Sequence, residues 1–496
     1  MATAFVLLHV AAVILRDPPL WDEADYLDWG RRFLIDGAPL TLPQCPGYSL
    51  LLGACSLVFG PVGAIRIVAI GSTLAFAGAI GSIAFLVWRS STARGLATVL
   101  ALGSAHSLST IGVHRTAIAI LLLGALALAS ERRKPWGLFV FLLCALGAYV
   151  VRPEVVWAAP ILPLAMWRLA PGSRPSKKAT RWLYVGGVAA LVVAATVHAA
   201  HDGAARNWLA FQQHYSLYRQ PQLSEKLGPS FSPWFDFERV VAIDLPGATS
   251  PLGAFGAAPV LVLGFLLANA KAAAMLALSS MAASPRAEWL VLTIDMAIVV
   301  LAVSSRAKAK SGRAGVGWFV LAMAVTSVTA VEAVSNHRHV IGLSIALAFL
   351  LGLLASRGLA ERRFAKPVPV VVAGASLWVG CTATYKEVRY AKDCGYPVST
   401  IIAAIRRDPG GRPLKIAGQC NACFCAYAAS SCTEIGPPQG YTAATQCALF
   451  EGDADIVALR IEPGAEAAPP CGAVGYRLLG RWPSIEMEVW RRGSAE

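Results

Sequence analysis

Long apolar stretches, separated by short polar ones, recur along most of the chain. A helix needs about 20 mostly apolar residues to cross a hydrocarbon layer of ~30 Å, and eleven stretches approach that length. The pattern therefore predicts a polytopic α-helical membrane protein with about 11 transmembrane helices. The predicted spans are residues 1–15, 62–88, 95–113, 116–130, 136–151, 155–167, 182–200, 287–305, 314–331, 340–356 and 367–384.

Composition supports lipid as the solvent of this chain. Of its 496 residues, 56% are hydrophobic and only 15% are charged, and the mean hydropathy is +0.57. A water-soluble globular protein of this size does not normally show that balance. The first span has no basic residues before it and no evident cleavage site before Trp21, so we expect a retained anchor rather than a signal peptide.

The basic residues indicate the orientation, because short cytoplasmic loops collect Lys and Arg. Every second predicted loop is basic, and together these five loops hold 18 Lys and Arg but only two acids. The loops lie at 89–94, 131–134, 168–181, 306–313 and 357–366. The net charge of +14 is therefore a topology signal and does not indicate nucleic-acid binding. The amino terminus is predicted to be cytoplasmic and the carboxyl terminus external.

This orientation divides the chain into two domains. Residues 1–384 form the membrane domain, whose first external loop is 16–61 and whose long external segment is 201–286. Within that segment, 203–220 has the polar and aromatic pattern of an interfacial helix. Residues 255–284 are apolar but interrupted by Asn269 and Lys271, so we expect them to be interfacial or re-entrant, with a full span as the alternative.

The tail from 385 to 496 has a soluble composition and predicts an external α/β domain. A helix is expected at 397–407, and the expected strands are 414–417, 455–461, 476–479 and 485–490. Eight cysteines are expected outside, an even number that suits disulfides in an oxidising compartment, although the pairing stays open. They are Cys45, Cys394, Cys420, Cys423, Cys425, Cys432, Cys447 and Cys471. A zinc site in the run CNACFC is the alternative, but a second C-x-x-C at ribbon spacing is missing.

The first external loop is the densest candidate for chemistry. Asp22, Glu23, Asp25 and Asp28 fall within seven residues, directly after the first span. Solvation of an external loop would also explain such a cluster. At a membrane boundary, however, partial desolvation raises the pKa of a carboxylate toward that of a working base.

The loop and several later segments resemble the GT-C superfamily of integral membrane glycosyltransferases, in the branch of the protein mannosyltransferases and bacterial aminoarabinose transferases. The resemblance covers most of the membrane part. Its elements are Asp22-Glu23 after the first span, Tyr26, Pro46-Gly47-Tyr48, Phe59-Gly60, Arg66, Arg152-Pro153-Glu154, and Asn336-His337-Arg338-His339.

The resemblance implies that Asp22 is the catalytic base of an inverting transfer, with Glu23 in support, although the two adjacent acids could exchange roles. The donor would be a sugar on a polyprenyl phosphate. Its leaving phosphate needs preorganised cations, for which Arg338 and His339 are the first candidates. His337, Arg115 and Arg152 follow.

Each of these residues also has a structural interpretation. Arg338 and His339 could simply mark the end of a span, where basic side chains reach the interface. Arg152 and Glu154 could be a local ion pair instead of part of a substrate site, and Tyr48 an aromatic belt residue instead of part of a sugar pocket.

Two charges fall inside predicted spans. Arg66 and Asp295 are expected to pair with each other, or else to form a proton or ion relay. Nucleotide-binding and hydrolase motifs such as the P-loop, G-x-G-x-x-G after a strand, H-E-x-x-H or G-x-S-x-G do not occur.

The sequence therefore predicts a bacterial plasma membrane glycosyltransferase that uses a polyprenyl-phosphate sugar. Its acceptor would be an envelope lipid, polysaccharide or protein. No cofactor is firmly indicated, and a divalent cation stays open. The alternatives are a transporter or flippase of lipid-linked saccharides, which would tolerate Asn at position 22, and a non-catalytic scaffold that presents the tail.

Overall fold

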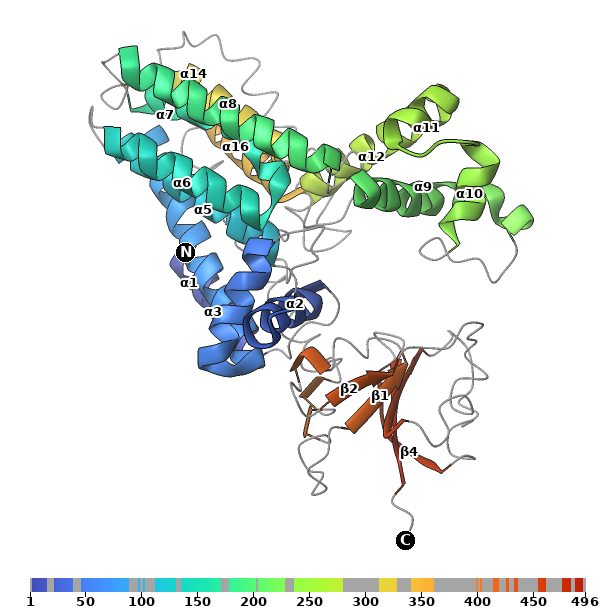
Figure 1. The fold of residues 1–496 in the computed structure, drawn as a ribbon. Coiled ribbons are helices and arrows are strands. Elements are labelled where there is room, and N and C mark those ends of the chain that lie inside the picture. Colours follow the sequence, from blue (N-terminus) through green and yellow to red (C-terminus); the bar gives the residue numbers. More distant parts are fainter. Residues whose placement is uncertain are drawn as a thin grey trace.

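The structure is a computed structural model, and Figure 1 shows its fold. It describes residues 2–15, 22–38, 46–88, 97–98, 101–102, 112–130, 135–170, 178–201, 204–227, 236–279, 312–327, 340–360, 398–399, 402–403, 414–418, 425–427, 432–435, 454–460, 475–482 and 487–493. The predicted spans 287–305 and 367–384, with Asp295, lie outside these residues.

The chain begins with three helices: α1 (Ala2–Leu15), α2 (Asp22–Asp36) and α3 (Pro46–Val87). The acids that open α2 favour its helical state, because negative charge stabilises a helix N-terminus. The long helix α3 bends at Gly60, whose φ of 72° suits glycine. The predicted span 62–88 thus corresponds to the second limb of α3, and its first limb, residues 46–59, belongs to the predicted loop.

The next group of helices corrects two predictions. Helix α5 runs from Gly112 to Ser130, so His114 and Arg115 lie in its first turn and not in a connection between two spans. After α6 (Pro135–Val151), the predicted span 155–167 is divided into the 3₁₀ helix η1 (Pro153–Ala158) and the short helix α7 (Leu162–Leu169). Prolines in this segment favour the break, because a proline has no N–H to donate within a helix.

Helix α8 (Lys178–His201) leads into a separate group with its own apolar core. This group contains α9 (Ala204–Leu227), α10 (Phe237–Asp244), α11 (Pro251–Ala257) and α12 (Pro259–Ser279). The helix predicted at 203–220 is confirmed by α9. The apolar segment 255–284, expected to be interfacial or re-entrant with a full span as the alternative, contains α12, which is one continuous helix long and apolar enough to cross a membrane.

The described residues contain three helices that are long and apolar enough to cross a membrane: Pro46–Val87, Gly112–Ser130 and Pro259–Ala277. Shorter apolar helices match other predicted spans, among them α6, α14 (Gly312–Val325) and α16 (Ile341–Ala360). Helix α14 packs against both α7 and α16. The chain is thus a helical membrane protein.

The tail contains a five-stranded sheet with the order β2-β1-β3-β5-β4. Strands β1 (Leu414–Gly418), β2 (Cys432–Ile435) and β3 (Ile456–Arg460) are parallel, whereas β4 (Tyr476–Trp482) and β5 (Met487–Arg492) complete the sheet as antiparallel strands. Four of the five strands fall where the sequence predicts them, and β2 was not predicted. Of the helix expected at 397–407, residues 398–399 and 402–403 are described and helical.

One apolar core joins the two parts of the chain. It includes Leu27 of α2 and Leu52 of α3, and it continues to Ile416 of β1 and Ala458 of β3. In Figure 1 the sheet accordingly lies beside α2, next to the helical part. The short helix α2 therefore lies between the long helices and the sheet.

Candidate functional site

The carboxylate of Glu23 is the centre of the candidate site. Its side chain is buried, with 3% exposed. The oxygen Oε1 accepts a hydrogen bond of 3.1 Å from the Tyr48 hydroxyl and one of 2.5 Å from the backbone N–H of Gly112. Three helices, α2, α3 and α5, therefore meet at one carboxylate.

Close helix packing fixes α2 on the first limb of α3. A Cβ added to Gly30 would lie 1.9 Å from the Ser49 carbonyl oxygen, and one added to Gly53 would lie 2.6 Å from the Gly30 backbone. Only glycine at both positions allows the two backbones to approach this closely. Glu23 and Tyr48 are thus carried by two helices that form one tightly packed unit.

Aromatic contacts continue this unit to Tyr48. The ring of Tyr26 packs edge to face on Tyr48, with centroids 5.5 Å apart, and on Trp29, with centroids 5.9 Å apart. Such pairs contribute about 0.5–1.5 kcal/mol beyond the area that they bury. Tyr48 is 2% exposed, so its hydroxyl is held toward Glu23 and away from solvent.

Gly112 has no room for a side chain. A Cβ at this position would lie 2.6 Å from the Tyr48 hydroxyl oxygen and 3.5 Å from Oε1 of Glu23. As the first residue of α5, Gly112 also has an N–H without an intrahelical acceptor, which the Glu23 carboxylate satisfies. A carboxylate at a helix N-terminus is favoured by the helix dipole as well.

A second group of charges lies beside this one, on the first turn of α5 and the start of η1. Arg152 forms an ion pair with Glu154, and Nε2 of His114 lies 3.6 Å from the same carboxylate. Burial alone would raise the pKa of Glu154, but the Arg152 guanidinium and then His114 outweigh it and hold that pKa well below its usual range. Glu154 therefore stays ionised at neutral pH.

Arg115 extends from α5 toward the second limb of α3. Its side chain is 1% exposed. Nε donates to the Ser72 hydroxyl at 3.2 Å, and Nη2 donates to the Ala69 carbonyl at 3.4 Å. The cation is also close enough to the Tyr48 hydroxyl to interact with it electrostatically. A buried cation thus lies near the carboxylate of Glu23.

This arrangement and the order of the helices can be compared with solved structures. The crystal structure of ArnT from Cupriavidus metallidurans bound to undecaprenyl phosphate matches the chain with a TM-score of 0.53 at 10% sequence identity. The match covers 99% of this chain and 97% of ArnT. The chain has a GT-C-like fold.

A further solved structure is less similar to this GT-C-like chain. The archaeal oligosaccharyltransferase AglB from Archaeoglobus fulgidus, in complex with an inhibitory peptide and a dolichol-phosphate, matches with a TM-score of 0.45 at 10% identity. That match covers 93% of this chain and 69% of AglB. At the level of sequence, no known protein family and no curated protein matches the chain.

The GT-C-like fold brings together several of the residues singled out in the sequence. Tyr48 donates to Glu23 and interacts electrostatically with Arg115. Arg152 and His114 both approach the carboxylate of Glu154. Asp22 begins α2, but its side chain is not among those that the structure describes. His337, Arg338 and His339 lie outside the described residues.

Three contributors were not predicted from the sequence. They are Gly112, which donates to Glu23, Ser72, which accepts from Arg115, and the close pair of Gly30 and Gly53. Glycine and serine are common in membrane helices, so neither type marks a site by itself. Among the described residues, no group of three or more His, Cys, Asp or Glu is placed to hold a metal ion.

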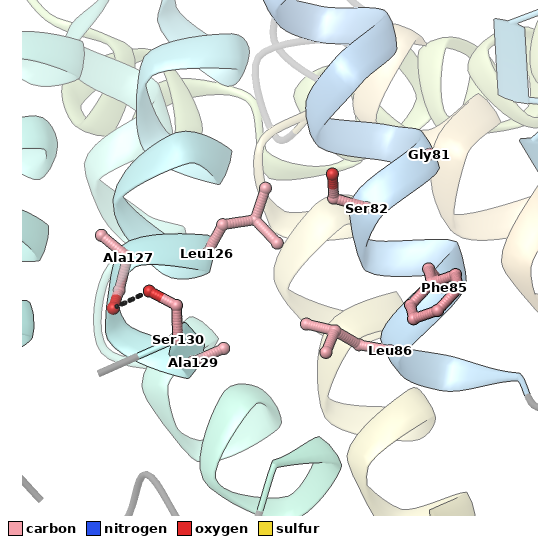
Figure 2. Close-up of a pocket in the computed structure, with 8 residues that line it drawn as sticks. All are labelled: Gly81, Ser82, Phe85, Leu86, Leu126, Ala127, Ala129 and Ser130. Atoms are coloured by element: carbon pink, nitrogen blue, oxygen red, sulfur yellow. Dashed lines mark hydrogen bonds between the residues drawn. The ribbon is translucent and has the colours of Figure 1, made fainter. Parts of the chain in front are cut away.

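A cavity of about 590 Å³ between α3 and α5 is separate from this site (Figure 2). It begins roughly 20 Å along α5 from Gly112, at ~1.5 Å per residue. Its lining is apolar apart from two serines and contains no titratable side chain, so it offers no acid or base. The lining residues are Gly81, Ser82, Phe85, Leu86, Leu126, Ala127, Ala129 and Ser130.

Proposed function

We propose that this chain is a membrane glycosyltransferase, which moves a sugar from a polyprenyl-phosphate donor to an acceptor in the bacterial envelope. The observation that carries the proposal is the GT-C-like fold over 99% of the chain, shared with a protein crystallised with undecaprenyl phosphate. The buried carboxylate of Glu23 adds a chemically competent site to that fold. The acceptor would be a lipid, a polysaccharide or a protein.

The reaction is a single displacement at the anomeric carbon. A carboxylate takes the proton of an acceptor hydroxyl, the hydroxyl oxygen forms a bond to the anomeric carbon, and the bond from that carbon to the phosphate oxygen breaks. Polyprenyl phosphate leaves with the electron pair. One displacement inverts the anomeric configuration of the sugar.

Asp22 is the base in this proposal, and Glu23 positions the surrounding helices. Glu23 is buried, and its Oε1 already accepts from Tyr48 and from Gly112. A base must come within about 3 Å of the acceptor hydroxyl. A buried carboxylate whose oxygen already accepts hydrogen bonds from two other helices is badly placed for that contact. Asp22 begins α2 and is the other member of the adjacent pair.

The leaving phosphate requires positive charge close to it. Arg338 and His339 are the proposed contacts, supported by His337 and Arg115. Arg152 is a weaker candidate than the sequence suggests, because its guanidinium is engaged with Glu154. These cations follow from the chemistry of the leaving group, which departs with negative charge.

The proposal places the reaction on the external side of the plasma membrane. The five basic loops predict a cytoplasmic amino terminus, and α2 and the sheet then lie outside. Disulfides among the external cysteines belong to the same proposal. Most of these cysteines lie outside the described residues.

Comparing Asp22→Asn with wild type in cells that lack the protein tests the proposal. Asp36→Asn is the matched control, because it makes the same change at the exposed far end of α2. At equal membrane levels, mass spectrometry should show that wild type and Asp36→Asn restore the missing envelope sugar. Asp22→Asn should leave the lipid-linked donor accumulating.

Equal restoration by all three proteins would reject Asp22 as the base and favour a flippase of lipid-linked saccharides. If cells that lack the protein lose the envelope sugar but show no change in any lipid-linked donor, both functions are rejected.

A further inference from the structure

The side chain of Arg31 adds a hydrogen bond to the apolar core that joins the acid-bearing helix α2 to the tail. Nη1 of Arg31 donates a hydrogen bond of 3.0 Å to the backbone carbonyl of Ala426, across 395 positions of sequence. Figure 1 shows the sheet beside α2. Two segments that lie far apart in the sequence are thus connected on the helix that carries Glu23.

The acceptor of this bond is a fixed point. Ala426 lies in a short helical turn, residues 425–427, between β1 and β2, and neither Ala426 nor Tyr427 is exposed. Both belong to the apolar core that contains Ile416 of β1. The Ala426 carbonyl therefore belongs to a buried part of the tail, packed in the same core as β1.

The donor is equally constrained on its own helix. Arg31 follows Gly30, whose backbone is in close contact with the first limb of α3. Its guanidinium is partly withdrawn from water, and this burial lowers the pKa of Arg31 from its ordinary value, although Asp28 and Asp36 oppose the change. A partly buried guanidinium that donates to a carbonyl acts as a structural tie.

The neighbouring arginine shows the contrast. Arg32 carries the same charge on the same helix, but its side chain is 51% exposed and pairs with Asp28 one turn earlier, at 2.7 Å. That pair joins two residues of α2 itself. Position on the helix, and not charge, therefore distinguishes the two residues.

A displacement at Arg31 would reach the carboxylate of Glu23. Trp29 contacts Tyr26, Tyr26 contacts Tyr48, and Tyr48 donates to Glu23. All but Tyr48 lie on α2 itself. The backbones of α2 and the first limb of α3 are in direct contact at Gly30 and Gly53, so these two helical segments would move together. The bend at Gly60 connects them to the rest of α3.

We propose that Arg31 is a positioning residue, through which the tail sheet holds α2 and its carboxylates in place for the reaction. The link between tail and helix stands on the contacts alone, whereas its effect on catalysis rests on the proposed function. Loss of the tie should lower kcat more than it raises KM for the lipid donor. A small misplacement of a reacting group costs up to about 100-fold in rate.

The test compares full-length wild type, Arg31→Gln, Arg31→Lys and Arg32→Gln in lipid nanodiscs. Arg32→Gln is the matched control, and lysine retains a charged donor that can reach a carbonyl. Hydrogen exchange of the backbone amides reports the tie without reference to activity. Transfer kinetics with a polyprenyl-phosphate sugar then report kcat and KM separately.

The expected result is faster exchange in both 22–36 and 425–427 for Arg31→Gln alone, with partial protection restored by lysine. Its kcat should fall about 10- to 100-fold, with KM changed less than about threefold. Unchanged exchange in these segments, or an equal effect of Arg32→Gln, would overturn the proposal, as would an equal loss of exchange protection in every helix. If exchange responds as expected but wild type transfers no sugar, the tie is supported and the proposed function fails.

Discussion

The hydroxyl of Tyr48 donates a hydrogen bond of 3.1 Å to the carboxylate of Glu23, and the two residues lie 25 positions apart on different helices. Both side chains are buried. A buried carboxylate that accepts from a phenol and from a backbone N–H is a joint between helices. The position of the acids at the start of α2 therefore depends on a tyrosine of α3 and a glycine of α5.

Tyr48→Phe should weaken this joint without changing the shape of the side chain. Leaving a buried acceptor with one donor fewer costs about 1–3 kcal/mol in the free energy of unfolding. Transfer activity should fall as well, because α2 loses one of its anchors. Both effects can be measured on the detergent-solubilised protein by denaturant unfolding and by transfer from a polyprenyl-phosphate sugar.

Tyr184→Phe is the control for this prediction. The Tyr184 hydroxyl donates to the Pro160 carbonyl at 2.9 Å, away from α2. Its removal should lower stability but leave transfer activity near that of wild type. Equal losses of activity in the two variants would show that Tyr48 matters only for general stability.

Gly112→Ala should damage the site more than its size suggests. The added methyl carbon would lie 2.6 Å from the Tyr48 hydroxyl oxygen, and that phenol is packed on all sides and has nowhere to move. We expect activity to fall at least about tenfold, as for a misplaced catalytic group. Gly71→Ala on α3 is the matched control, because a Cβ there meets no atom within 4 Å. Equal activity of the two alanine variants would contradict the prediction.

Hydropathy was sufficient to place most helices but not the start of α5. The sequence placed a connection near His114 and Arg115 because polar residues interrupt the apolar pattern there. In the structure both are buried in the first turn of α5. His114 lies beside the Glu154 carboxylate, and Arg115 donates to the Ser72 hydroxyl. Burial of a charge with its partner is a tertiary effect, and a hydropathy window detects only the charge.

The acids of the first loop were singled out from the sequence, but the burial of Glu23 could not be predicted from it. That burial depends on Tyr48 and Gly112, which lie 25 and 89 positions away. The strand β2 was missed for a similar reason, because its residues Cys432–Ile435 have a weak strand pattern and pair only with β1. Partners that are remote in sequence decided both outcomes.

Arg152→Gln should destabilise the protein strongly at neutral pH. It would leave the Glu154 carboxylate buried without its guanidinium partner and with only His114 of its two described ionic contacts, and breaking a buried ion pair costs about 3–5 kcal/mol. The double variant Arg152→Gln/Glu154→Gln should recover most of this loss. Failure of the double variant to recover any stability would contradict the ion-pair explanation.

The stability of the single variant Arg152→Gln should change with pH in a defined direction. In wild type the pKa of Glu154 is held below its ordinary 4.5, so the stability from this pair is present above that pH and is lost as the pH falls through the folded-state value. Without Arg152, burial raises that pKa, and protonation relieves the cost. The deficit of Arg152→Gln relative to wild type should therefore shrink on acidification, as measured by thermal unfolding between about pH 4 and 8.

Asp28→Asn should have the opposite sign and stabilise the protein at neutral pH. Burial raises the pKa of Asp28 above its ordinary 3.8, and Arg32 and Arg31 only partly oppose this. The folded protein then binds the proton of Asp28 more tightly than the unfolded chain does. The stability that this proton contributes is complete below the unfolded-state pKa and is lost as the pH rises through the folded-state pKa. Asparagine stays neutral and avoids that loss. Thermal unfolding should show Asp28→Asn above wild type at pH 7 and the two converging as the pH approaches 3.8. A gap between Asp28→Asn and wild type that stays constant with pH would mean that packing, and not ionisation, separates them.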